Sequence, residues 1–130
     1  CYSILKEAGI KCNVYTSPHI QKINERYVFN NEQLKDDELT SLFEEVEKIN
    51  ENEPITFFEI LTACFFYKAA QYPNNLNLIE AGLFHRFDAT NILKNNLASV
   101  CALLVRIILI GYQKISERLK KLYLKRPPLY

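Results

Sequence analysis

The apolar and polar positions of the first 35 residues predict one short helix and two extended segments. Residues 1–8 have helical spacing, and Gly9 stands where such a helix would end in a left-handed turn. Residues 10–15 alternate in polarity, which predicts a strand, and the Thr-Ser-Pro-His segment that follows would break it. Residues 27–29 predict a second, shorter extended segment that leads into an Asn-Asn turn.

The middle of the chain has helical spacing twice. A helix is predicted from Asp36 or Asp37, either of which would cap it, to about residue 50. Its apolar face would carry Leu39, Leu42, Phe43, Val46 and Ile49. After a break at residues 51–54, Thr56 and Glu59 have the spacing of a capping box. The helix that they open is apolar on nearly all sides and is therefore predicted to be buried, ending near residue 72.

The last third predicts two more strands. Residues 76–79 form a short apolar strand, residues 80–91 a polar loop, and residues 98–105 a buried strand. Residues 106–130 have helical spacing. This order predicts an α/β domain with a mostly parallel sheet flanked by helices. In such sheets ligands bind beyond the carboxyl ends of the strands, so the loops after residues 15 and 79 are expected to converge on a site.

Composition narrows the class of protein. The chain has 130 residues, of which 48% are hydrophobic and 24% charged, which fits one globular domain and excludes whole-chain disorder. The longest uninterrupted apolar run, residues 100–105, is far too short to span a membrane. The sequence contains no methionine, so we expect it to be processed or to be a piece of a longer protein.

Cysteine and charge patterns raise two questions. Cys1, Cys12, Cys64 and Cys101 have no metal-binding spacing, and buried reduced thiols in a cytosolic protein are favoured over a disulfide framework. Residues 1–100 carry 9 Lys/Arg and 14 Asp/Glu, whereas residues 101–130 carry 7 and 1. Such a change of sign marks either a tail for nucleic acid or membrane, or a tail foreign to the rest of the chain.

The two strand-end loops hold the chemistry. The first contains Ser17, His19, Asn24, Glu25 and Arg26; the second contains Glu80, His85, Arg86, Asp88, Thr90 and Asn91. Taken singly, most have an ordinary structural explanation: Ser17 as a turn residue, the Glu-Arg pair as a solvated ion pair, Asp88 and Asn91 as loop caps. Glu80 is harder to explain in this way, because it directly follows an apolar strand.

Four motifs in order give a family resemblance. They are Val14-Tyr15-Thr16-Ser17-Pro18-His19 with Asn24-Glu25-Arg26, then Thr56-Phe57-Phe58-Glu59 with Leu61-Thr62-Ala63, then Leu78-Ile79-Glu80-Ala81-Gly82-Leu83, then Asp88-Ala89-Thr90-Asn91-Ile92. Over residues 1–102 the chain resembles the folylpolyglutamate synthase/dihydrofolate synthase branch of the Mur ligase superfamily. The resemblance implies part of a P-loop-type central ATPase domain, lacking the Gly-rich phosphate-binding loop.

The resemblance also implies an activity. Enzymes of this branch use ATP and Mg²⁺ to convert a folate or dihydropteroate carboxylate into an acyl phosphate, which the amino group of L-glutamate attacks. By this resemblance Ser17 and Glu80 would hold the metal, and His19, Glu25, Arg26, Arg86, Asp88 and Asn91 would bind substrate. It implies a cytoplasmic monomer that binds neither nucleic acid nor membrane, and a chain that is inactive alone.

Two departures qualify the match. Phe84-His85 stand where the family has a Gly-Gly pair, which puts the shape of that loop in doubt. The family's downstream Asp-His and Glu-Lys motifs are missing, although one permitted back-translation of residues 106–130, read in another frame, contains both. We therefore predict an ATPase-domain part at residues 1–102 and an aberrant, frameshifted basic tail at 103–130. The alternative is a non-catalytic interaction module with a basic amphipathic tail.

Overall fold

The computed structural model describes residues 1–82, 87–93 and 96–100. The chain divides into two compact units, Cys1–Lys94 and Asn95–Tyr130, and all the elements below belong to the first. The predicted helix at 106–130 and the basic tail lie outside the described residues. The predicted strand at 98–105 is wrong for its first three residues, which form no strand and are exposed, Val100 by 86%.

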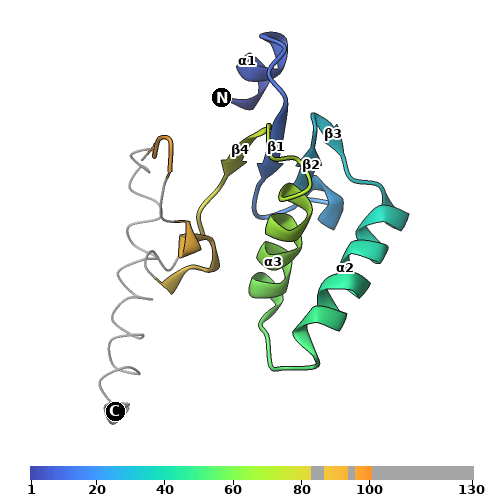
Figure 1. Ribbon diagram of the computed structural model, residues 1–130. Helices are drawn as coiled ribbons and strands as arrows, with labels where there is room; N and C mark the ends of the chain where they lie inside the picture. The colour runs from blue at the N-terminus through green and yellow to red at the C-terminus, as the bar shows by residue number, and fades with distance from the viewer. Residues whose placement is uncertain (83–86, 94–95, 101–130) are drawn as a thin grey trace. The chain divides into compact units, whose positions relative to one another are not determined.

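A four-stranded sheet of order β3-β2-β1-β4 is the framework of the first unit (Figure 1). Its strands are β1 (Cys12–Tyr15), β2 (Tyr27–Phe29), β3 (Glu32–Gln33) and β4 (Leu76–Ile79). β1 pairs with β4 in parallel, whereas β1–β2 and β2–β3 are antiparallel. The predicted α/β class is confirmed, but the sheet among the described residues is mixed rather than mostly parallel. The reason is local: a two-residue turn joins β2 to β3, and residues 16–26 join β1 to β2, a connection shorter than the dozen or more residues that a parallel crossover needs.

Helix α2 (Asp36–Asn50) begins and ends close to its predicted bounds. Its N-cap is Lys35, not Asp36 or Asp37, and the Glu38 carboxylate accepts the Lys35 N–H at 3.0 Å. Asp36 lies inside the first turn, and its carboxylate accepts a hydrogen bond from the Asn24 side chain at 2.9 Å instead of capping the helix. Of the predicted apolar face, Leu39, Leu42 and Val46 are buried, whereas Ile49 in the last turn is 62% exposed.

Helix α3 (Phe57–Ala69) opens with the predicted capping box. Glu59 N donates to Thr56 Oγ1, and the Glu59 carboxylate accepts the Thr56 N–H at 2.9 Å. The prediction that this helix is buried is confirmed for Leu61, Cys64 and Phe65, which are completely buried, and is wrong for Phe57 and Tyr67, which are exposed. The helix packs one face into the core. It ends at Ala69, three residues before the predicted end near residue 72.

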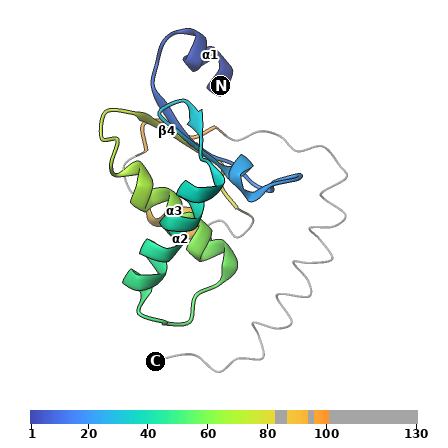
Figure 2. The same ribbon diagram turned by 90° about the vertical axis from the view of Figure 1, so that its right-hand side faces the viewer.

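The core lies between the sheet and these two helices, which cover the same face of the sheet (Figures 1 and 2). Aromatic rings form its centre: Phe65 of α3 stacks on Tyr15 at 5.2 Å and on Phe29 at 5.5 Å between ring centroids. Buried Tyr27 satisfies its hydroxyl by donating to Leu61 O at 2.9 Å. Stacked rings of this kind contribute beyond the area that they bury, so the layer anchors β1 and β2 to α3.

Helix α1 (Tyr2–Glu7) precedes β1, and Gly9 ends it with φ of 75°, as predicted. Cys12 and Cys64 are buried free thiols, which confirms the prediction for these two; Cys1 is free but exposed, and Cys101 is outside the described residues. Burial raises the pKa of Cys64 to about 12. Within the described residues, no helix has the length and apolar character needed to cross a membrane.

Candidate functional site

The parallel pair of β1 and β4 brings two loops to one edge of the sheet. Tyr15 is in register with Ile79, and Glu80 N donates to Tyr15 O at 2.9 Å, which extends the pairing by one residue. Ser17 N then donates to Glu80 Oε2 at 2.7 Å. The predicted convergence of the two loops is confirmed at this point.

Ser17 and Glu80 are suitable ligands for a hard cation. Ser17 is half-buried, Glu80 is exposed, and together they present a hydroxyl and a carboxylate. Mg²⁺ prefers oxygen ligands and is usually held by one or two carboxylates with waters and phosphate oxygens completing the octahedron. No group of three His, Cys, Asp or Glu side chains in the described part of the chain is arranged around a metal position. The pair therefore fits a metal shared with a phosphate ligand rather than a closed protein site.

The first loop closes on the short 3₁₀ helix η1 (Ile23–Arg26), which precedes β2. Glu25 Oε2 accepts the N–H of Ile20 at 2.7 Å, and Oε1 accepts those of Gln21 and Lys22 at 2.9 and 2.8 Å. These backbone hydrogen bonds hold the pKa of Glu25 below its ordinary value, because they stabilise the ionised carboxylate. Glu25 therefore does not form the solvated ion pair with Arg26 that was the structural alternative for these two residues.

Arg26 turns inward from η1. Its Nε donates to His19 Nδ1 at 2.9 Å, so a neutral His19 carries its proton on Nε2. The Arg26 side chain is buried, and among the described residues its Nη1 has no hydrogen-bond partner. A buried guanidinium near two strand-end loops suits the binding of an anion.

A pair of hydroxyl side chains that was not predicted joins β1 to α3. Tyr15 and Thr62 are both buried, and their hydroxyl oxygens are 3.2 Å apart. Burial raises the pKa of Tyr15, whereas the hydrogen bond to Thr62 and the charge of Arg26 oppose that shift. Both residues belong to the motifs that carry the family resemblance. The signal that could have predicted their contact is a hydroxyl side chain within an otherwise apolar strand or helix.

The second loop carries Asp88, which is buried. Its Oδ1 accepts the N–H of Thr90 at 3.0 Å and the Thr90 hydroxyl at 2.6 Å, and thereby caps the 3₁₀ helix η3 (Ala89–Ile92). Gly82 lies directly against the Asp88 carboxyl and the Phe58 ring, and leaves no room for a Cβ. Gly82 was not among the predicted site residues. The only indication of its role in the sequence is its position in the E-x-G-L motif.

The structure thus places the predicted site residues unequally. Ser17 meets Glu80, and His19 meets Arg26, whereas Glu25 binds its own loop. Asn91 is exposed on η3, and its N–H donates to Asp88 O at 2.9 Å. Arg86, with Phe84 and His85, lies outside the described residues.

Several known proteins with similar sequences are named dihydrofolate synthase/folylpolyglutamate synthase. The chain is 36% identical over 103 residues to a dihydrofolate synthase/folylpolyglutamate synthase of Escherichia coli, and 38% identical over 99 residues to one of Bacillus subtilis. These matches cover 78% and 71% of the chain, but only 24% and 23% of the two relatives. The chain therefore spans about a quarter of the length of these relatives. No family model matches it.

Solved structures agree with the sequence matches. Escherichia coli FolC in complex with DHPP and ADP matches with a TM-score of 0.64 at 35% identity, covering 70% of this chain and 22% of that one. A folylpolyglutamate synthase/dihydrofolate synthase of Yersinia pestis with AMPPNP and Mn matches with a TM-score of 0.65 at 32% identity, covering 71% and 22%. A further folylpolyglutamate synthase/dihydrofolate synthase structure, with Mn, AMPPNP and L-glutamate bound, matches with a TM-score of 0.65 at 28% identity, covering 85% of this chain and 29% of that one.

Proposed function

This chain belongs to the dihydrofolate synthase/folylpolyglutamate synthase family, and we propose that it supplies part of the ATP-binding domain of a cytoplasmic ligase. The ligase joins L-glutamate to the carboxylate of a folate or of dihydropteroate. The observation that carries this proposal is the meeting of Ser17 with Glu80 at the carboxyl edge of the parallel strands, within the motifs that gave the resemblance. The ligands of its structural relatives, a nucleotide with Mn and DHPP or L-glutamate, suit such a reaction.

The chemistry proceeds in two displacements. A substrate carboxylate oxygen bonds to the γ-phosphorus of ATP while the bond to ADP breaks, giving an acyl phosphate. The glutamate amine then bonds to the acyl carbon, inorganic phosphate leaves, and the amine loses a proton. Mg²⁺, when bound, would neutralise the negative charge of the phosphates.

The residues of this chain have separate tasks in that scheme. Ser17 and Glu80 would hold the metal. His19, Arg26, Arg86, Asp88 and Asn91 form the side of the site that we assign to substrate, and Glu25 lies on that side with its carboxylate bound to its own loop. Of these, Arg26 offers a buried cation whose charge complements an anionic substrate, and His19 is oriented by it. We expect no ligation by the 130 residues alone, since their sequence contains no Gly-rich phosphate loop.

A chimeric enzyme tests the proposal. Residues 1–93 of this chain would replace the matching segment of the Escherichia coli relative, and glutamate addition to dihydropteroate and to tetrahydrofolate would be measured. We expect activity in the chimera and its loss in the same chimera with Glu80→Gln. A chimera that folds and binds ATP but forms neither product would overturn the proposal. Glu44→Gln, an exposed change on α2, is the matched control.

A further inference from the structure

Three attachments tie the loop of residues 16–22 to the end of η1. At the start of the loop, Thr16 N donates to Arg26 O and Thr16 Oγ1 donates to Glu25 O, both at 3.2 Å. In the middle, His19 accepts from Arg26 Nε. At the end, the N–H groups of residues 20–22 converge on the Glu25 carboxylate. Ser17 therefore lies between two positions that are both fixed on η1.

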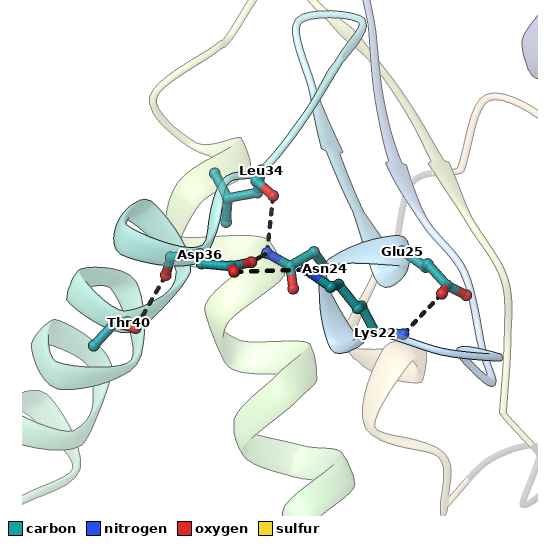
Figure 3. Close-up of polar contacts among 6 residues, drawn as sticks. All are labelled: Lys22, Asn24, Glu25, Leu34, Asp36 and Thr40. Carbon is teal, nitrogen blue, oxygen red and sulfur yellow. Dashed lines mark hydrogen bonds and ion pairs between the residues drawn. The ribbon is translucent and has the colours of Figure 1, made fainter.

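The 3₁₀ helix η1 is itself attached to the start of α2, as Figure 3 shows. Asn24 is buried, and its Nδ2 donates to Leu34 O at 3.0 Å and to Asp36 Oδ1 at 2.9 Å. Lys22 Nζ lies 3.7 Å from Asp36 Oδ2, an exposed pair that adds little. η1 is thus held by α2 on one side and holds the loop on the other.

Glu25 makes three of these attachments with one side chain. Both of its carboxylate oxygens are engaged, and the three donors are consecutive backbone N–H groups. Residues 17–22 form no helix or strand, so their N–H groups find no ladder partners among themselves. The Glu25 carboxylate accepts three of these N–H groups instead. Hydrogen bonds to a charged acceptor are stronger than those between neutral groups.

We propose that Glu25 is a positioning residue, whose carboxylate holds the loop 17–22 closed and so sets Ser17 beside Glu80 and His19 beside Arg26. This inference rests on the proposed function, because it is the proposed function that identifies the Ser17–Glu80 pair as a metal site. It assigns Glu25 an indirect role: the side chain acts on the metal and substrate positions through the loop.

Mn²⁺ binding to the full 130-residue chain tests the inference, with free Mn²⁺ measured by electron paramagnetic resonance. Glu25→Gln removes the charge and places an amide donor against the N–H groups, and is expected to weaken Mn²⁺ binding about tenfold. Glu25→Asp keeps the charge but shortens the reach, and is expected to weaken it nearly as much. Glu38→Gln is the matched control, because Glu38 accepts one backbone N–H at the start of α2, away from the loop.

Amide exchange supplies a second, independent measurement. In Glu25→Gln the amides of Ile20, Gln21 and Lys22 are expected to exchange faster, while the amides of α3 keep their protection. Together with weaker Mn²⁺ binding, this result supports the inference. Unchanged exchange at these three amides would overturn it, as would full Mn²⁺ affinity in Glu25→Gln.

The proposed function is judged separately, by Glu80→Gln. If Glu80→Gln keeps wild-type Mn²⁺ affinity, the metal assignment of the proposed function is wrong. The role of Glu25 in closing the loop is then decided by the exchange of residues 20–22 alone. If the wild-type chain alone shows no saturable Mn²⁺ binding, the same comparison is made in the chimera with AMPPNP present, because the pair is expected to share the metal with a phosphate.

Discussion

The two ends of the β1–β4 pair are built from opposite kinds of polar group. At the end where both strands begin, neutral amides meet: Asn13 Nδ2 donates to Asn77 Oδ1 at 2.8 Å, and Asn13 Oδ1 accepts from Asn30 N and Asn75 Nδ2, both at 3.0 Å. Asn13 is completely buried. At the end where both strands finish, charged side chains gather: Glu80, Glu25 and Arg26.

The amide end uses its polar groups within the protein. Asn31 repeats the pattern of Asn13, since its side chain accepts from Cys12 N at 3.0 Å and donates to Ile10 O at 2.9 Å. Asn30 and Asn31 both have positive φ, which suits the tight β2–β3 turn. Such a network specifies the fold and leaves no charge for a ligand.

The charged end keeps part of its chemistry open. Glu80 is exposed although its Oε2 accepts the Ser17 N–H, and Arg26 is buried with one nitrogen unpaired among the described residues. The same two strands thus serve stability at one end and binding at the other, and substitutions should separate the two.

The largest effect is expected from Asn13→Ala at the amide end. It leaves the Asn30 N–H and the Asn77 carbonyl oxygen without their partner, which should lower the free energy of unfolding by about 2–3 kcal/mol. Urea titration measures this, with Gln33→Ala, at an exposed position of β3, as the control. A loss no larger than that of Gln33→Ala would show that the amide network does not stabilise this end.

Gly82→Ala should be the next largest, because a Cβ would collide with the Asp88 carboxyl and crowd the Phe58 ring. We expect a loss of about 1–3 kcal/mol in urea titration. Gly9→Ala at the amide end is the contrast: its φ of 75° is unfavourable for alanine, but nothing lies within 4 Å of the new Cβ. Equal losses at the two glycines would argue that Asp88 moves away freely.

Glu80→Gln should change binding and hardly change stability. The amide oxygen can still accept the Ser17 N–H, so unfolding is expected to stay within about 0.5 kcal/mol of wild type. Mn²⁺ affinity should fall about tenfold, or about 1.4 kcal/mol. Asn13→Ser, at the other end of the strand, should leave Mn²⁺ affinity unchanged wherever the chain remains folded. A large loss of stability in Glu80→Gln would contradict the division between the two ends.

Acid should loosen the charged end first. The pKa of Glu25 is held below its ordinary value, so its stabilising effect is complete above about pH 4.3 and disappears as the pH falls through the lower folded value. Protection factors of the Ile20, Gln21 and Lys22 amides should fall in this range, before that of the Asn30 amide, whose acceptor Asn13 does not titrate. Glu25→Gln should abolish the pH dependence; its persistence there would point to another group.

Local patterns in the sequence predicted the elements well where one segment suffices. The capping box at Thr56, the left-handed Gly9 and the strand 76–79 depend on neighbours in the chain, and the structure confirms each. The errors arose where a distant partner decides. Asp36 accepts from Asn24 instead of capping α2, and α3 leaves Phe57 exposed, because side-chain partners and the exposed face of a helix depend on tertiary packing.

The sequence alone determined the class of fold, the family and the candidate metal pair, because the motifs keep their residue types and spacing along the chain. Only the tertiary structure decided which of those residues meet. The parallel register of Tyr15 with Ile79 brings Ser17 to Glu80 across 63 residues of sequence, whereas Glu25 turns back onto its own loop. The physical reason is that hydrogen bonds need their partners within about 3 Å, and which groups come that close depends on strand pairing and loop closure.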